Sequence, residues 1–153
     1  MGIEIERKFL VDTAKLPPLL NGKKLLQGYL VPRTPSIRIR TSGNEAFLTI
    51  KGDSSNGITR SEFEYPIPLT DALELLKQCK GLLISKIRYE ISHEGHLWEL
   101  DIFENENDGL IVAEIELESE DEEFALPNWA TTEVSNDPRY TNASLSQLPY
   151  SQW

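Results

Sequence analysis

The sequence predicts a mainly β fold of the α+β class: a closed tunnel barrel of eight antiparallel strands with a few flanking helices, in a single domain over residues 1–153. Two observations predict this fold. Eight segments have the composition and period-two alternation of strands with two unlike faces. Clusters of Gly, Asn, Asp and Ser separate most of these segments, as hairpin turns do, so most neighbouring strands are expected to be antiparallel.

The first predicted strand begins at Ile3, where Glu and Ile alternate before Lys8. The eight predicted strands cover residues 3–10, 25–31, 36–41, 45–51, 59–65, 83–91, 97–103 and 110–118.

Three short helices are predicted between and after the strands. Residues 70–79 form a Leu-rich segment with Thr70 available as N-cap and Gly81 as a stop signal. Residues 119–122, Ser-Glu-Asp-Glu, fit a capping box that opens a second helix. Residues 139–147 predict a third helix, which ends before Pro149.

Composition excludes several classes of function. The formal net charge is -10 with no Lys/Arg-rich run, which disfavours nucleic-acid binding because that binding needs a basic face. No apolar stretch approaches the length of a membrane span, and the N-terminus lacks the pattern of a signal peptide. We therefore expect a cytoplasmic protein with neither nucleic-acid nor membrane partners. The lone Cys79 cannot form an internal disulfide.

Charged residues recur on one face of the predicted strands, and they occur in pairs of like sign two residues apart. The cationic pairs are Arg38 with Arg40 and Lys86 with Arg88, and the anionic pairs are Glu4 with Glu6, Glu62 with Glu64 and Glu114 with Glu116. If these faces point outward, the barrel has an apolar lumen like that of a lipocalin. If they point inward, the lumen is a charged tunnel.

Three features favour the inward orientation. Like charges two apart on a strand repel unless a ligand of opposite sign lies between them. The apolar faces have helices against which to pack. Clustered carboxylates are ligands for a hard cation such as Mg²⁺ or Mn²⁺, while clustered Arg and Lys bind phosphate oxygens. A polyphosphate would join the two groups.

The pattern Glu4-x-Glu6-x-Lys8 near the N-terminus resembles the signature of the CYTH superfamily, the triphosphate tunnel metalloenzymes, and the later charged pairs follow that family's order. The chain is most similar to its compact bacterial inorganic triphosphatase type. The resemblance implies an eight-stranded tunnel with a C-terminal plug helix, often homodimeric, that acts on small-molecule triphosphates with divalent metal, Mg²⁺ or Mn²⁺, as two ions.

The resemblance also implies roles for the charged residues. The expected metal ligands are carboxylates: Glu4, Glu6, Glu62, Glu64, Asp101, Glu114 and Glu116. The expected triphosphate contacts are cations: Lys8, Arg38, Arg40, Lys51, Lys86, Arg88 and Arg139. A lysine crowded by other cations is easier to deprotonate, so Lys51 or Lys86 is a candidate general base, with Tyr29 as its hydrogen-bonding partner.

The substrate expected from this resemblance is inorganic tripolyphosphate, cleaved to pyrophosphate and phosphate, because the short chain offers no obvious segment to hold a base or a thiazolium ring. Class IV adenylate cyclase and thiamine triphosphatase activities are alternatives. A polyphosphate-binding module without catalysis is an alternative from another class.

Overall fold

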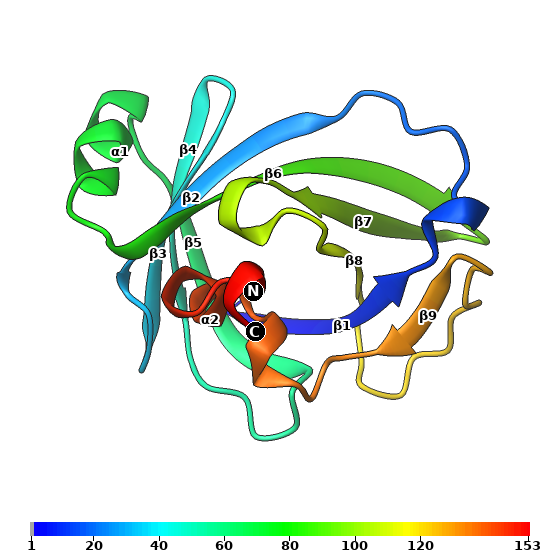
Figure 1. Cartoon of the computed structure of the whole chain (residues 1–153). Helices are drawn as coiled ribbons and strands as arrows, with labels where there is room; N and C mark the ends of the chain where they lie inside the picture. The colour runs from blue at the N-terminus through cyan, green and yellow to red at the C-terminus, as the bar shows by residue number, and fades with distance from the viewer. Residues whose placement is uncertain (1) are drawn as a thin grey trace.

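The computed structural model describes residues 2–153 and shows a barrel with two α-helices in that range (Figure 1). The strands are β1 (Ile3–Val11), β2 (Lys23–Val31), β3 (Ser36–Ser42), β4 (Glu45–Lys51), β5 (Thr59–Pro66), β6 (Lys80–His93), β7 (His96–Phe103), β8 (Ile111–Glu116) and β9 (Ala130–Glu133). The helices are α1 (Leu69–Leu76) and α2 (Asn142–Gln147), and the 3₁₀ turns are η1 (Thr13–Lys15), η2 (Asn105–Asn107), η3 (Pro138–Tyr140) and η4 (Tyr150–Gln152).

Eight of the strands close the barrel in the order β5-β4-β3-β2-β6-β7-β8-β1, and β1 then pairs with β5. The closing ladder is short and places Glu4 opposite Arg60. The second half of β1 pairs with β8, with Lys8 opposite Glu114, and β9 is an added strand along the outer part of β1. The pairings are antiparallel, so the predicted closed eight-stranded antiparallel barrel is confirmed.

The inward-facing rows change from ionic to apolar along the barrel axis. At one end Ile84, Phe103 and Val112 face inward and enclose Leu145 of α2. Since α2 contacts the inner apolar residues of β6 and also lies near β2, it fills this end of the lumen. The charged residues of the same strands therefore line the part of the lumen that α2 leaves open.

The outward-facing rows pack beneath two covers. On one side Trp98, Leu100 and Ile115 are buried beneath a segment that includes Trp129. On the other side α1 covers β2, β3 and β4, and its Leu76 contributes to a cluster with Ile39. Burial of these apolar faces stabilises the barrel wall, which leaves the charged faces for the lumen.

Two of the three predicted helices are modified. The helix α1 begins at Leu69 with Pro68 as N-cap, and the predicted N-cap Thr70 lies inside it. The predicted stop, Gly81, lies in β6, where its φ of 74° suits glycine. The predicted C-terminal helix is divided into η3 and α2 at Thr141, whose hydroxyl accepts a hydrogen bond from the Ser144 N–H at 3.1 Å.

The predicted helix at residues 119–122 is wrong, because these residues form turns. The Glu122 carboxylate does accept a backbone hydrogen bond, from Glu118 at 2.6 Å, but the side chain also bonds His96 at 2.7 Å. Glu120 accepts hydrogen bonds from Asn56 and Thr59. These tertiary contacts hold the segment against the barrel and override the local capping signal. Within residues 2–153, no helix has both the length and the apolar character needed to cross a membrane.

Candidate active site

A cavity of about 240 Å³ lies inside the barrel, and it is lined almost entirely by polar side chains. Seven carboxylates line it: Glu4, Glu6, Glu62, Glu64, Glu99, Glu114 and Glu116. Seven basic side chains also line it: Lys8, Arg38, Arg40, Lys51, Arg60, Lys86 and Arg88. The remaining lining residues are Tyr29, Ser36, Thr141, Asn142 and Ala143. The charged rows therefore face a shared lumen, and the alternative of a lipocalin-like apolar lumen is excluded.

The carboxylates come from one side of the barrel and most of the cations from the other; Lys8 of β1 and Arg60 of β5 lie among the carboxylates. Arg38, Lys51 and Lys86 come from β3, β4 and β6, which together with β2 form one continuous half of the barrel. Glu114 and Glu6 come from β8 and β1, which are neighbours, and β5 completes the acidic side where it closes on β1. The alternation of β-strand side chains positions each row, and strand order then separates the signs.

The acidic side holds more negative charge than its surroundings neutralise. Burial, and then the nearby charges of Glu114 and Glu4, raise the pKa of Glu6 well above its usual range, and a hydrogen bond with Glu114 adds to this. The pKa of Glu114 is lowered: burial opposes this, but the charges of Lys8 and Arg88 outweigh burial. Glu6 therefore binds its proton more tightly than a free carboxyl group does, and a bound cation could replace that proton.

The basic side offers cations with unused hydrogen-bond donors. Arg38 is only 6 % exposed; its Nη2 donates to Thr49 at 3.1 Å and Glu64 at 3.4 Å, whereas its buried Nε has no partner among residues 2–153. Burial, followed by the charges of Arg38 and Arg88, lowers the pKa of Arg40 to about 10. Buried donors and mutually repelling guanidinium groups favour a bound anion.

Asp101 joins the two cations of β6. Lys86 and Asp101 are both fully buried, and the Lys86 Nζ donates to Asp101 Oδ2 at 2.7 Å. Arg88 donates to both oxygens of the same carboxylate, at 2.7 and 2.9 Å. Burial, aided by Arg88 and Arg40, lowers the pKa of Lys86 to about 7 in spite of the opposing charge of Asp101.

The other two lysines of the cavity contact carboxylates of the acidic side. The Lys51 Nζ donates to both oxygens of Glu4, at 3.0 and 3.1 Å, and lies 3.4 Å from Glu62. Burial lowers the pKa of Lys51, but Glu4 and other carboxylates outweigh this and raise it. Lys8 lies 3.7 Å from a Glu114 oxygen.

Comparisons with known proteins agree with this geometry. The CYTH domain family model matches residues 2–148. This chain belongs to the CYTH family. It is 43 % identical over 152 residues to an inorganic triphosphatase from Acetivibrio thermocellus, covering 98 % of this chain and 97 % of the relative. It is 40 % identical to an inorganic triphosphatase from Nitrosomonas europaea, covering 94 % and 96 % of the two chains. The crystal structure of the inorganic triphosphatase NE1496 superposes with a TM-score of 0.67 at 36 % identity, covering 94 % of this chain and 93 % of that chain.

Two residues singled out from the sequence lie outside the lining of the CYTH cavity. Asp101 lies within the wall, where its two carboxylate oxygens accept hydrogen bonds from Lys86 and Arg88 and hold these two cations in place. Arg139 donates to Asp137 at 2.7 Å, and its guanidinium lies 4.7 Å from the centre of the Trp153 ring.

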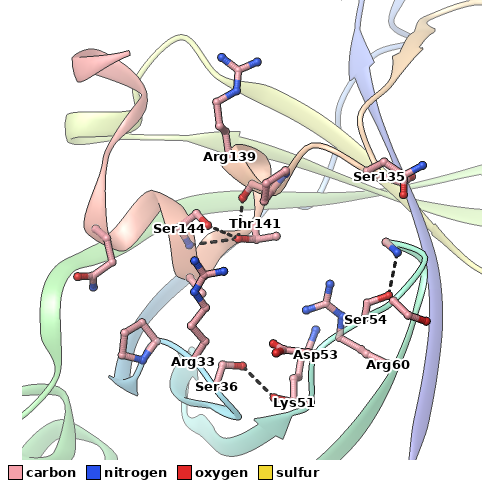
Figure 2. A pocket seen from close by; sticks show the side chains of 18 of the residues that line it. Arg33, Ser36, Lys51, Asp53, Ser54, Arg60, Ser135, Arg139, Thr141 and Ser144 are labelled. Atoms are coloured by element: carbon pink, nitrogen blue, oxygen red, sulfur yellow. Dashed lines mark hydrogen bonds between the residues drawn. The ribbon is translucent and has the colours of Figure 1, made fainter.

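Arg139 lines a larger groove of about 760 Å³ that adjoins the cavity beside α2. The groove and the cavity share Ser36, Lys51, Arg60, Thr141 and Ala143. Figure 2 shows Arg139 at the rim of this groove, pointing away from Lys51 and Arg60.

Sequence reasoning missed several lining residues of the CYTH cavity. Arg60 has the same strand parity as Glu62 and Glu64, so the alternation could have identified it. Thr141 and Asn142 come from the C-terminal segment, where strand alternation gives no signal. Glu99 of β7 also lines the cavity, and its parity is that of Asp101.

The carboxylates of the CYTH cavity match the donor chemistry of a hard divalent cation. Among residues 2–153, no three His, Cys, Asp or Glu side chains converge closely enough to hold a metal without other ligands. Mg²⁺ nevertheless needs only one or two carboxylates when water and substrate phosphates complete its shell. Glu6 and Glu114 are suited to bind such an ion, because burial and then the negative charge of Glu114 raise the pKa of Glu6, and a cation between them would relieve that repulsion.

Proposed function

We propose that this CYTH protein hydrolyses inorganic tripolyphosphate to pyrophosphate and phosphate with Mg²⁺ or Mn²⁺. The observation that carries the proposal is a cavity inside the barrel with most of its cations on one side and its carboxylates on the other. Relatives named inorganic triphosphatase, at 43 % and 40 % identity over nearly the whole chain, support the same activity.

Charge balance supports a triphosphate bound together with metal. Seven acidic and seven basic side chains line the cavity, so its formal charge is balanced before anything binds. A triphosphate alone would bring several negative charges into a poorly solvated space, which is costly. Two divalent ions held on the acidic side would compensate that charge.

The metal ligands of this proposal are Glu4, Glu6, Glu114 and Glu116, with Glu62 and Glu64 completing the shells directly or through water. Asp101 is left out of the set because Lys86 and Arg88 occupy its oxygens. A bound divalent ion would polarise phosphoryl oxygens and lower the pKa of a bound water.

The triphosphate would lie against the basic side of the cavity. Arg38, Arg40 and Arg88 suit this contact because each guanidinium presents a planar fork of donors to phosphate oxygens. Lys8 and Lys51 add point charges. Phosphoryl transfer requires little covalent chemistry from the protein, so orientation and charge neutralisation by these groups account for most of the catalysis.

Lys86 is the better of the two candidate bases. Its pKa of about 7 leaves a sizeable neutral fraction near neutral pH, whereas the raised pKa of Lys51 keeps that side chain charged. Lys86 would therefore accept the proton that the attacking water releases, and Lys51 would contact a phosphate group. Tyr29 is buried in the cavity lining, where its hydroxyl would orient one of these groups.

A substrate panel tests the proposal directly. Tripolyphosphate, ATP and thiamine triphosphate are incubated with Mg²⁺, with Mn²⁺ and with a chelator, and phosphate, pyrophosphate and cyclic AMP are measured. The proposal predicts fastest metal-dependent release of phosphate from tripolyphosphate. Cyclic AMP formed from ATP at a matching rate would instead support a class IV adenylate cyclase, and metal-assisted binding without turnover would support a binding module.

Two variants test the metal assignment within that panel. Glu4→Gln and Glu6→Gln should abolish metal-dependent activity while the barrel remains folded. Glu90→Gln is the matched control, because Glu90 has the inward parity of β6 but is exposed and does not line the cavity. Cell fractionation and analytical ultracentrifugation test the expected cytoplasmic location and homodimer.

A further inference from the structure

We propose that Gln27 and Asn142 are positioning residues that form an amide relay, which fixes how Lys86 and Arg40 present their polar atoms to the substrate. The inference rests on the proposed function, since it concerns the same cavity. It adds two uncharged residues, one from β2 and one from α2, that the assignment of metal ligands and phosphate contacts leaves out.

Three hydrogen bonds define the relay. The Arg40 Nε donates to Gln27 Oε1 at 2.9 Å. The Gln27 Nε2 donates to Asn142 Oδ1 at 3.1 Å, and the Lys86 Nζ donates to the same oxygen at 3.0 Å. Gln27 is fully buried, so water cannot replace these partners.

The direction of each hydrogen bond follows from the arginine end. A guanidinium has only donors, so the amide oxygen of Gln27 must face Arg40. The amide nitrogen of Gln27 must then face Asn142, which in turn must present its own oxygen. The Lys86 Nζ meets that oxygen and has to donate to it. The orientation of both amides is thus determined by chemistry, and the relay has one consistent arrangement.

This arrangement constrains the amino group of Lys86. The nitrogen is tetrahedral; one position holds Cε, and two are directed to Asp101 Oδ2 at 2.7 Å and to Asn142 Oδ1 at 3.0 Å. The fourth position has no hydrogen-bond partner within residues 2–153, and Lys86 lines the cavity. The relay therefore determines where Lys86 directs its remaining proton or lone pair.

The same relay constrains Arg40. Gln27 holds the Nε, and the terminal nitrogens of Arg40 have no hydrogen-bond partner among the described residues. These two donors remain for phosphate oxygens. Since Gln27 lies directly opposite Arg40 in the β2–β3 ladder, the backbone register holds the pair together.

The position of Asn142 depends on the C-terminal segment. Asn142 is the first residue of α2, the preceding Thr141 caps that helix, and Leu145 is fully buried in the inner apolar cluster. Docking of α2 inside the barrel thus brings an amide oxygen to a lysine of β6. The helix that fills one end of the lumen also orients a group within it.

A variant series tests the relay. Asn142→Leu and Gln27→Met remove the amides at similar volume, and we expect each to lower kcat by about 10- to 100-fold, because small misplacements of positioned groups have effects of that order. The kcat of the double variant should remain within about threefold of the kcat of the less active single variant, since either change already breaks the relay. Asn142→Asp keeps the acceptor for both donors, so it should retain kcat within about threefold and raise KM, because its charge repels the triphosphate.

The matched control is Ser146→Ala. Ser146 is buried in α2 and its hydroxyl donates to the Ala143 carbonyl at 2.6 Å, but it does not line the cavity. We expect this variant to retain kcat. Three outcomes would overturn the relay. The losses of kcat could multiply in the double variant, Asn142→Asp could lose as much kcat as Asn142→Leu, or Ser146→Ala could lose as much kcat as the relay variants.

Failure of the relay can be distinguished from failure of the proposed function. A wild-type protein that hydrolyses no tripolyphosphate would overturn the proposed function alone. The relay is then tested by unfolding Gln27→Met, Asn142→Leu and the double variant in urea. A measurable coupling between the two changes in unfolding free energy supports the relay, and strictly additive changes refute it.

Discussion

Asp101 provides the sharpest test of how the structure divides the charged residues, because the sequence indicates a metal ligand and the geometry indicates a buried counter-ion. Asp101 is fully buried and accepts hydrogen bonds from Lys86 at 2.7 Å and from Arg88 at 2.7 and 2.9 Å. In Asp101→Asn the shape is retained, but the negative charge is lost and an NH₂ group must face a donor. The fully buried Lys86 and the partly buried Arg88 then lose their common partner.

The expected loss of stability follows from that geometry. Removing one partner of a buried ion pair typically costs about 3–5 kcal/mol, since the remaining charge stays desolvated. For a chain of this length each kcal/mol lowers the Tm by about 2–4 °C, so the variant should melt about 6–20 °C below the wild type. A metal ligand would behave differently: without metal, its removal would relieve repulsion and leave stability unchanged or higher.

The assay is thermal and urea unfolding of Asp101→Asn and wild type in a chelator, with Glu116→Gln as the control. Glu116 also faces the cavity but is exposed, and burial together with Glu4 raises its pKa, so its neutralisation should not destabilise the protein. A melting temperature for Asp101→Asn within about 2 °C of wild type, which is about 1 kcal/mol or less on the same scale, would refute the counter-ion role.

Three further predictions concern single side chains. The raised pKa of Glu6 means that the folded state binds the proton of this carboxyl group more tightly than the unfolded state does, so the stability of the protein falls as pH rises above 4.5. Glu6→Gln should therefore melt no lower than wild type at pH 7 in a chelator, yet be inactive. Calorimetry of wild type and variant at pH 4 and pH 7 checks the sign of this effect. Because burial lowers the pKa of Lys86 to about 7, kcat/KM should rise as pH increases through about 7 and then level off. Lys86→Met should lose this rise, and an unchanged pH profile of the variant would exclude Lys86 as the base. Arg38→Met should raise the KM for tripolyphosphate by about tenfold or more, as expected for a lost charged hydrogen bond, whereas Arg139→Ala should change it by less than about threefold because that side chain is exposed; equal effects would place Arg139 at the substrate.

The barrel and most of its lining were predictable because they depend on a period of two. In Glu4-x-Glu6-x-Lys8, alternation puts three charges on one face, and the same rule assigns Arg38 with Arg40 and Lys86 with Arg88. Strand alternation does not determine whether those faces point into the barrel or out to solvent. The like charges two residues apart on one strand indicated the inward orientation, since such charges need a counter-charge.

The residues that sequence reasoning missed or misplaced depend on contacts between distant segments. Asn142 reaches Lys86 only because α2 docks inside the barrel. Asp101 has the parity of a cavity residue, but Arg88 opposite it and Lys86 of the same strand β6 occupy its oxygens within the wall. The capping box at Ser119 is overridden by hydrogen bonds to other parts of the chain. Local pattern identifies the face of a strand, but not the depth of a side chain or the partner of an exposed segment.

The distribution of charge indicates how an acidic protein can bind a polyanion. Of the 25 acidic and 15 basic residues, seven of each line the cavity, so the net charge of -10 belongs to the rest of the molecule. That exterior repels a free triphosphate at long range, whereas Arg33, Arg60 and Arg139 line the groove that leads to the cavity and oppose the repulsion locally. Since the repulsion acts over distances comparable to the Debye length, added salt screens it more than it screens the buried contacts inside the barrel. Arg60 lines both the groove and the cavity, whereas Arg33 and Arg139 line the groove alone and so would act on entry of the substrate. A rim arginine such as Arg139 and a cavity arginine such as Arg38 should therefore respond differently to the same substitution.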